Sequence, residues 1–274
     1  MLLATVIPYW KSPSFDLGPF HLELFGVFVA LGVGLAAWII QRQAERDGLD
    51  PRPLQDYALW GVGFGVLVGH WFHLLAYHHE EITSVWSFFR VWSGLSSFGG
   101  LLGGIIGAAI FFRKSKIPMA PYHDALALGV APGWAIARIG CFVVHDHPGV
   151  FSHSFLAVNF PMAYYGGPRL DLGLVDCLWL FGITAVLFGL RKAGKADGRL
   201  MPLLALLYGM GRFCFDFLRA TDLSYIDHRY FGLTPAQYGS ILLVIYGVYR
   251  LIKPAAGAVH ARKTQASGEK LPTA

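Results

Sequence analysis

The sequence predicts an all-α integral membrane protein with seven transmembrane helices, its amino terminus outside and its carboxyl terminus in the cytoplasm. Composition gives the class, because hydrophobic residues make up 55% of the 274 positions and charged residues only 14%, a balance typical of membrane chains. Spacing gives the helices, because most of the seven apolar stretches approach the ~20 residues that a helix needs to cross a bilayer.

The predicted spans are separated by loops with polar and basic residues. They cover residues 19–41, 55–77, 95–112, 121–144, 171–190, 200–219 and 235–252. The first 18 residues hold no long apolar run with a cleavage site, so we expect the first span to serve as the insertion signal. We expect one transmembrane domain over residues 1–252 and a mobile cytoplasmic tail over residues 253–274.

Lysine and arginine in the loops predict the orientation, because basic loops stay in the cytoplasm. The loops after the first, third and fifth spans and the tail hold 15 basic residues, and the opposite side holds 4. The net charge of +5 therefore calls for no nucleic-acid partner, since cytoplasmic loops supply it.

Eight ionisable residues within or at the edges of the spans fall at one depth, in the outer half of the bilayer. Such groups are costly in hydrocarbon, so they usually face the bundle interior and mark a site or pathway. We expect a site for a charged ligand at this depth. The eight are Glu23, His70, His73, Arg138, Asp176, Arg212, Asp216 and Arg219.

The arginines point to an anion. Arg212, Asp216 and Arg219 are spaced four and three apart, so they share one helix face. A local ion-pair ladder would satisfy them, but two arginines with one aspartate leave a surplus positive charge that suits a lipid phosphate. Arg138 is either a structural partner of Asp176 or Glu23, or a phosphate clamp for which its planar fork is suited.

The remaining metal-binding residue types predict no metal site and no cofactor. His70 and His73 lie three apart on one helix face, but hydrogen bonding within the bundle is the commoner explanation of such a pair. Solvated loop histidines are likewise the commoner explanation of residues 145–147. Cysteines within spans are expected to pack as small apolar residues. They are Cys141, Cys177 and Cys214.

Four segments resemble, in order, motifs of the bacterial prolipoprotein diacylglyceryl transferases. Residues 89–94 and 97–101 are similar to FRVWDGGMSFHGGL, and residues 137–142 resemble the start of GRLGNFINGE. Residues 208–219 resemble the YG-x-x-R-x-x-x-E-x-x-R helix, and residues 234–238 the T/S-x-x-Q segment that opens the last span.

The resemblance implies an enzyme of the bacterial plasma (inner) membrane. It would move the diacylglyceryl group of phosphatidylglycerol to the lipobox cysteine of a preprolipoprotein, among membrane lipids, with glycerol phosphate as the leaving group. Arg138 and Arg212 would hold the phosphate, and Asp216 would orient them or the substrate. The further substrate-binding residues expected are Gly99, Gly100, Gly140, Asp146 and Arg219.

The chain departs from the family pattern at the residue before Gly99, where Phe98 replaces a histidine. Cys141 stands in place of an asparagine and Asp146 in place of a glutamate. We therefore predict that His70 or His73 accepts the thiol proton, in preference to His145, which we expect at the water boundary.

Three alternatives to this transferase are considered. The first is action on another lipid or acceptor, and the second is binding or transport of anionic phospholipid without catalysis. The third, an ion or proton channel, is less favoured because surplus arginine suits phosphate better than cations.

Overall fold

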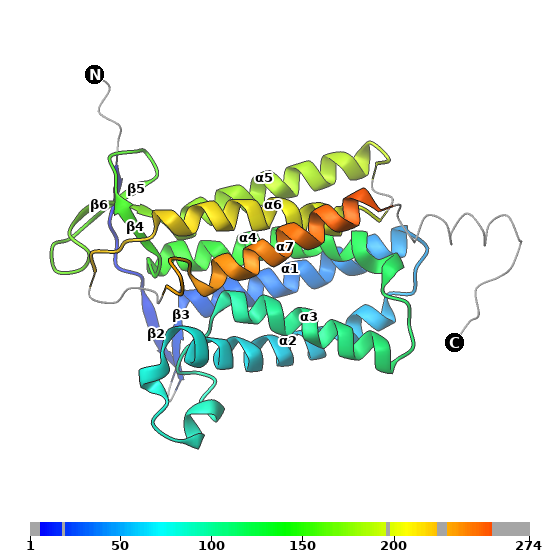
Figure 1. The fold of residues 1–274 in the computed structure, drawn as a ribbon, viewed down its shortest axis with the longest axis horizontal. Helices are drawn as coiled ribbons and strands as arrows, with labels where there is room; N and C mark the ends of the chain where they lie inside the picture. The colour runs from blue at the N-terminus through cyan, green and yellow to red at the C-terminus, as the bar shows by residue number, and fades with distance from the viewer. Residues whose placement is uncertain (1–5, 18–19, 196–197, 224–228, 254–274) are drawn as a thin grey trace, which may run out of the picture.

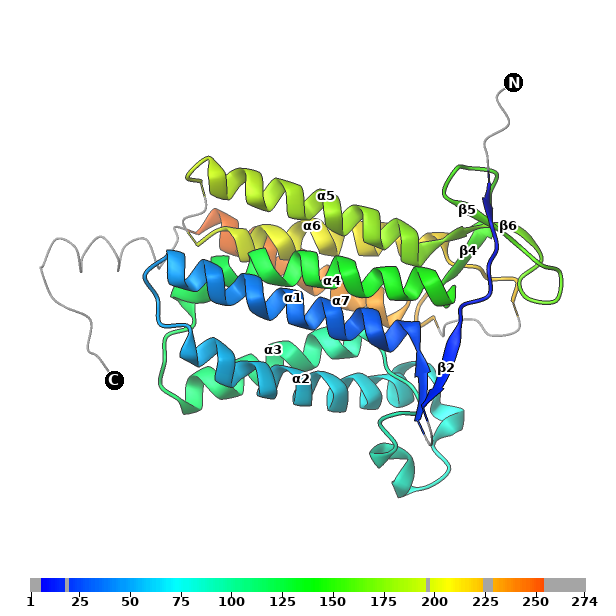
Figure 2. The same cartoon turned by 180° about the vertical axis from the view of Figure 1, so that it is seen from behind.

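The computed structural model describes residues 6–17, 20–195, 198–223 and 229–253. Within them, seven long α-helices lie side by side in one bundle, and short strands cover one end of it, called here the sheet end (Figures 1 and 2). The helices are α1 (Leu24–Arg46), α2 (Arg52–Phe72), α3 (Ser97–Lys114), α4 (His123–Val144), α5 (Leu172–Lys192), α6 (Leu200–Phe215) and α7 (Pro235–Ile252).

Six of the described helices, α1 to α6, are long and apolar enough to cross a membrane. Two of them continue at the sheet end in tighter or wider turns, α2 through the π-helix His73–Tyr77 and α6 through the 3₁₀ turn Asp216–Leu218. Helix α7 forms at the residues of the seventh predicted span. Its first turns carry the polar side chains of Gln237, Tyr238 and Ser240. The chain is thus a multi-pass, predominantly helical membrane protein.

The short strands were not expected from the sequence. The first predicted span begins five residues too early, because Phe20–Glu23 forms β3, paired with β2 (Ser14–Leu17). A second sheet has the order β1-β5-β6-β4. Strands this short give too few alternating positions to be seen as a pattern in the sequence. The strands are β1 (Ile7–Pro8), β4 (Pro148–Phe151), β5 (Ala157–Phe160) and β6 (Gly167–Asp171).

Helix α4 lies at the centre and packs against α1, α5 and α6. Its charged side chain Arg138 is therefore withdrawn from lipid. Small residues line its contacts, and Ala127, Ala131 and Ala135 are completely buried. Close packing also joins α2 to α3. A Cβ at Gly103 would lie 2.2 Å from the carbonyl oxygen of Phe64, so only glycine fits that contact.

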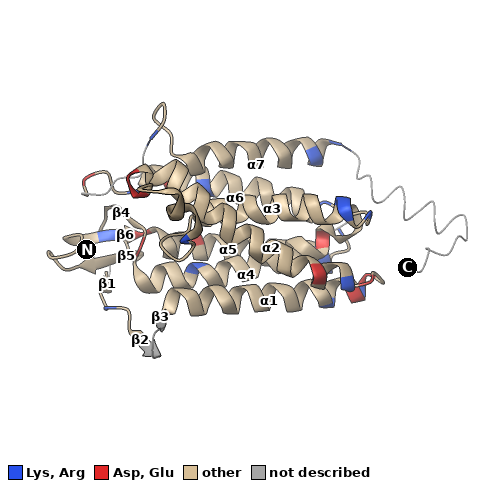
Figure 3. Ribbon diagram, turned by 90° about the horizontal axis from the view of Figure 1, so that it is seen from below, with Lys and Arg blue, Asp and Glu red and all other residues tan. Residues whose placement is uncertain are grey.

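The two ends of the bundle differ in charge. Lysine and arginine gather at the end opposite the sheet, where α1, α3, α5 and α7 finish (Figure 3). At this end Asp124 is buried, and its carboxylate accepts the N–H groups of Gly198 and Leu200 at 2.7 and 2.9 Å. That carboxylate ties the start of α6 to α4.

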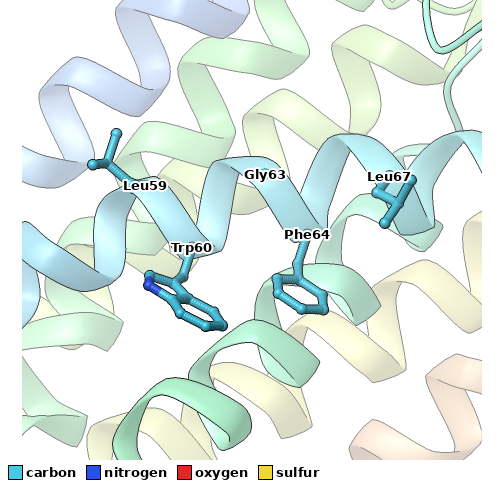
Figure 4. Close-up of a pocket in the computed structure, with 5 residues that line it drawn as sticks. All are labelled: Leu59, Trp60, Gly63, Phe64 and Leu67. Carbon is cyan, nitrogen blue, oxygen red and sulfur yellow. The ribbon is translucent and has the colours of Figure 1, made fainter. Parts of the chain in front are cut away.

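A groove of about 300 Å³ lies along α2 and is mainly apolar (Figure 4). No charged side chain lines it, and the indole N–H of Trp60 is its one hydrogen-bonding side-chain group, so we seek the site for a charged ligand inside the bundle. The groove is lined by Leu59, Trp60, Gly63, Phe64 and Leu67.

Candidate functional site: a buried arginine and aspartate cluster

Three neighbouring helices bring four of the predicted residues together near the sheet end. Arg138 lies on α4, Asp176 on α5, and Arg212 and Asp216 on α6 and the turn that follows it. All four side chains are buried. Each apolar helix therefore contributes its charge to the interior of the bundle, where the charges meet.

The contacts form an unbroken chain. One carboxylate oxygen of Asp176 accepts Arg212 Nη1 at 3.1 Å and forms an ion pair with Arg138, whose Nη2 lies 3.2 Å away. Asp216 Oδ1 accepts Arg219 Nε at 3.0 Å and forms an ion pair with Arg212, whose Nη2 lies 2.9 Å away. Arg138 and Arg212 thus converge, and Asp176, rather than the exposed Glu23, is the partner of Arg138.

Asp216 is also held by groups that the sequence analysis did not assign to the site. Its second oxygen accepts the hydroxyl of Thr234, the N-cap of α7, and its backbone carbonyl accepts Arg229 Nη2 at 3.3 Å. Thr234 belongs to the T-x-x-Q segment, so a signal for it existed. Arg229 lies in a loop counted only for its charge, and no motif marks it.

The cluster carries surplus positive charge. The four arginines that meet it, Arg138, Arg212, Arg219 and Arg229, face the two carboxylates of Asp176 and Asp216. Among the described residues, the buried atoms Arg138 Nε, Asp176 Oδ1 and Arg229 Nε have no hydrogen-bond partner. Buried polar atoms are normally paired, so excess charge and free donors together favour an anion with several acceptor oxygens, such as a phosphate.

The rim of the site follows directly after α4. Arg138 Nη1 donates to Cys141 Sγ at 3.6 Å, and Arg219 Nη2 lies 3.4 Å from His147 Nδ1. Asp146 is a rim residue, as its side chain is 40% exposed. Partial burial, followed by Arg219, Arg138 and Arg212, lowers the pKa of His147 well below its usual value. Its imidazole is therefore neutral at pH 7.

His145 does not lie at the water boundary, and that expectation was wrong. It is buried in a left-handed backbone conformation with φ of 54°. Its Nδ1 pairs with Asp171 Oδ2 at 2.7 Å, and the rings of Trp10 and Phe160 lie against it. Asp171 also caps α5 by accepting the N–H of Leu174. His145 therefore joins the end of α4 to the start of α5.

The predicted bases His70 and His73 have other partners. His70 is completely buried, with Nδ1 2.9 Å from the carbonyl oxygen of Gly94 and Nε2 2.8 Å from that of Ser87. His73 Nε2 lies 3.2 Å from Glu81. Within the described part of the chain, neither histidine forms a hydrogen bond or ion pair with Arg138 or Arg212. The contacts of His70 with Ser87 and Gly94 indicate that it anchors the loop before α3.

Two of the predicted glycines, Gly99 and Gly140, let neighbouring helices approach closely. A Cβ at Gly99 would lie 2.4 Å from Phe72 Cβ, and one at Gly140 would lie 3.0 Å from Phe28 Cβ. These positions pack α3 on α2 and α4 on α1. Gly100 is more open, with its nearest neighbour 3.7 Å away. Ser97, at the start of α3, accepts Arg138 Nη2 at 3.3 Å, so this helix start reaches the cluster.

Fold and site together define a multi-pass membrane protein with a buried cluster of arginines and aspartates. The family model for prolipoprotein diacylglyceryl transferase matches residues 13–253. The chain belongs to the prolipoprotein diacylglyceryl transferase family.

The matches to individual relatives cover most of the chain. The chain is 28% identical over 260 residues to phosphatidylglycerol–prolipoprotein diacylglyceryl transferase 2 of Streptomyces coelicolor, covering 90% of this chain and 81% of the relative. It is 27% identical over 246 residues to the phosphatidylglycerol–prolipoprotein diacylglyceryl transferase of Bacillus licheniformis, covering 85% and 88%. The transferase of the same name from Chromohalobacter salexigens is 28% identical over 239 residues, again covering 85% and 88%.

Proposed function

We propose that this protein transfers the diacylglyceryl group of phosphatidylglycerol to the lipobox cysteine of a preprolipoprotein in the bacterial plasma membrane. The observation that carries the proposal is the meeting of Arg138 and Arg212 on one buried carboxylate oxygen, with surplus positive charge around them. Family membership and the names of the relatives supply the substrates.

The chemistry uses the cluster to bind the phosphate and stabilise it as it leaves. The acceptor thiolate attacks the glyceryl carbon that bears the phosphate ester, so a carbon–sulfur bond forms as the carbon–oxygen bond breaks. The electron pair goes to the departing glycerol phosphate, whose charge rises. Arg138, Arg212 and Arg219 are held in place by Asp176 and Asp216. Fixed guanidinium groups can stabilise that charge without reorganising.

The orientation belongs to the same proposal. We place seven spans, including α7, in one domain over residues 1–252, with the sheet end outside and the tail 253–274 in the cytoplasm. The basic end of the bundle supports this choice, because positive loops remain in the cytoplasm (Figure 3). Residues 254–274 lie outside the described part of the chain.

A transfer assay tests the proposal. Purified protein in vesicles would receive phosphatidylglycerol labelled in its acyl chains and a lipobox peptide, with a peptide carrying serine for cysteine as the control. We expect label on the cysteine peptide only, together with released glycerol phosphate. Binding of phosphatidylglycerol without any transfer would contradict the proposed reaction and favour lipid binding. Complementation of a strain depleted of its own transferase provides the test in cells.

A further inference from the structure

Three metal-binding side chains meet at the rim of the arginine cluster. Cys141 Sγ, a carboxylate oxygen of Asp146 and a ring nitrogen of His147 all lie within 4.8 Å of one another. Thiolate, carboxylate and imidazole are the ligands that Zn²⁺ takes in proteins, and tetrahedral coordination puts such atoms about 3.5 Å apart. Small side-chain movements would therefore close the three ligands around one ion.

The arrangement leaves one coordination position accessible. Cys141 is buried, whereas the side chains of Asp146 and His147 are 40% and 20% exposed. Three protein ligands with one open position are characteristic of catalytic zinc sites, and closed sets of four are characteristic of structural ones. A molecule from the sheet end could thus reach the fourth position.

Two neighbouring arginines contact the proposed ligands, and each is paired with an aspartate. Arg219 Nη2 lies 3.4 Å from His147 Nδ1, and the charge of Arg219 is offset by Asp216 Oδ1, 3.0 Å from its Nε. The charge of Arg138 is offset by Asp176 at 3.2 Å, and its Nη1 points to Cys141 Sγ at 3.6 Å. A donor in that place can hydrogen-bond a metal-bound thiolate, as partners outside the coordination sphere commonly do. Zn²⁺ with one thiolate and one carboxylate is neutral overall, so the occupied site itself carries no net charge beside the cluster.

We propose that Cys141, Asp146 and His147 bind a Zn²⁺ ion whose open position takes the acceptor thiol. This inference rests on the proposed transferase function. A thiol that coordinates zinc is deprotonated outright, and its proton leaves to water through the exposed rim. The thiolate held there would attack the glyceryl carbon as the bond from that carbon to the phosphate oxygen breaks, and glycerol phosphate would leave with the electron pair, held by the arginines. No oxidant or reductant takes part.

Two departures from the family motifs agree with a metal site at this place. Phe98 replaces the histidine of the family motif, so this chain lacks that group near the thiol. Cys141 replaces the asparagine of another motif, which supplies a metal ligand instead. The expectation that the chain holds no metal is revised by this proposal.

Cobalt binding tests the site directly, because Co²⁺ bound by a thiolate gives a charge-transfer absorption that zinc does not. Metal-stripped protein in nanodiscs of phosphatidylcholine would be titrated with Co²⁺. We expect a thiolate–cobalt band in the wild type and more than about tenfold weaker binding in Asp146→Asn and His147→Gln. The band should be lost in Cys141→Ser. Cys214→Ser and His153→Gln lie outside the group and serve as matched controls.

Two readouts separate this proposal from the proposed function. A thiolate–cobalt band without any transfer activity would support the metal site and contradict the transferase. Transfer that survives metal stripping, with no thiolate–cobalt band, would overturn the metal site and leave the transferase standing. Helical circular dichroism and retained phosphatidylglycerol binding would show that each variant is folded.

Discussion

Asp176 is the residue on which the cluster depends. One of its oxygens forms ion pairs with two guanidinium groups from different helices, so the carboxylate sets the separation of Arg138 and Arg212. Its other oxygen has no hydrogen-bond partner among the described residues. Because a buried charge left without its partner costs about 3–5 kcal/mol, the three side chains work as a unit.

Arg138→Lys keeps the charge but removes the planar fork, so we expect a large loss of transfer. The lysine ammonium cannot reach Asp176, Ser97 and a phosphate together. Transfer by the variant should fall by at least ~100-fold, the usual effect of losing one preorganised donor. The labelled-lipid assay measures it, with the exposed Arg113→Lys as control. Equal transfer rates for the two variants would show that Arg138 does not bind the phosphate.

His70→Ala should lower the stability of the fold more than it lowers the rate of transfer. The change removes the imidazole that lies between the carbonyl oxygens of Ser87 and Gly94. The carbonyl that accepted its N–H loses that hydrogen bond, at a cost of about 1–3 kcal/mol when buried. Thermal unfolding in detergent would show a lower midpoint than for His78→Ala, whose imidazole is half-exposed. A fully stable His70→Ala protein without transfer activity would instead restore His70 as the base.

Residue types and spacing were sufficient to find most of the cluster. Charged residues within apolar spans are rare enough that Arg138, Asp176, Arg212 and Asp216 stood out. Spacing alone left the partner of Arg138 open between Asp176 and Glu23, since helix order does not fix which helices touch. Arg229 could not be found, because a loop arginine near the membrane looks the same whether it folds inward or faces water.

At the level of helices, Phe98 on α3 and Gly239 on α7 form an interlocking contact. A Cβ at Gly239 would lie 1.7 Å from Phe98 Cζ, so the phenyl ring occupies the place of a side chain. The sequence showed that Phe98 replaces the family histidine, but only the fold shows that its ring packs on α7. Helix positions were predicted well because apolar runs determine them, and the short strands were missed.

Gly239→Ala should therefore destabilise the protein by about 1–3 kcal/mol, as overpacking does. Adding Phe98→Ala should relieve the clash, so the two changes together should cost less than their sum. Thermal unfolding of the four proteins in one detergent gives the coupling. Gly182→Ala, where an added Cβ meets nothing within 4 Å, is the matched control. Strictly additive effects would mean that the two helices do not interlock.

At the scale of the whole molecule, the proposed orientation is open to labelling. A cysteine at His153, in the sheet-end loop, should react with an impermeant maleimide on intact cells. A cysteine at Lys195, at the basic end, should react only after the cells are permeabilised. The parent for both carries Cys214→Ser, because that thiol is exposed. The reverse pattern would invert the topology.

The shared carboxylates also have a consequence for how the chain enters the bilayer during synthesis. Helix α4 emerges first with an arginine that has no ion-pair partner on its own helix, and an arginine in a span costs up to about 2.5–3.5 kcal/mol on insertion, the value at the helix centre. Asp176 arrives with α5, and Arg212 follows on α6 together with Asp216. Helices α4 and α5 should therefore leave the translocon as a pair, with α4 held at its edge until its counter-ion has been translated.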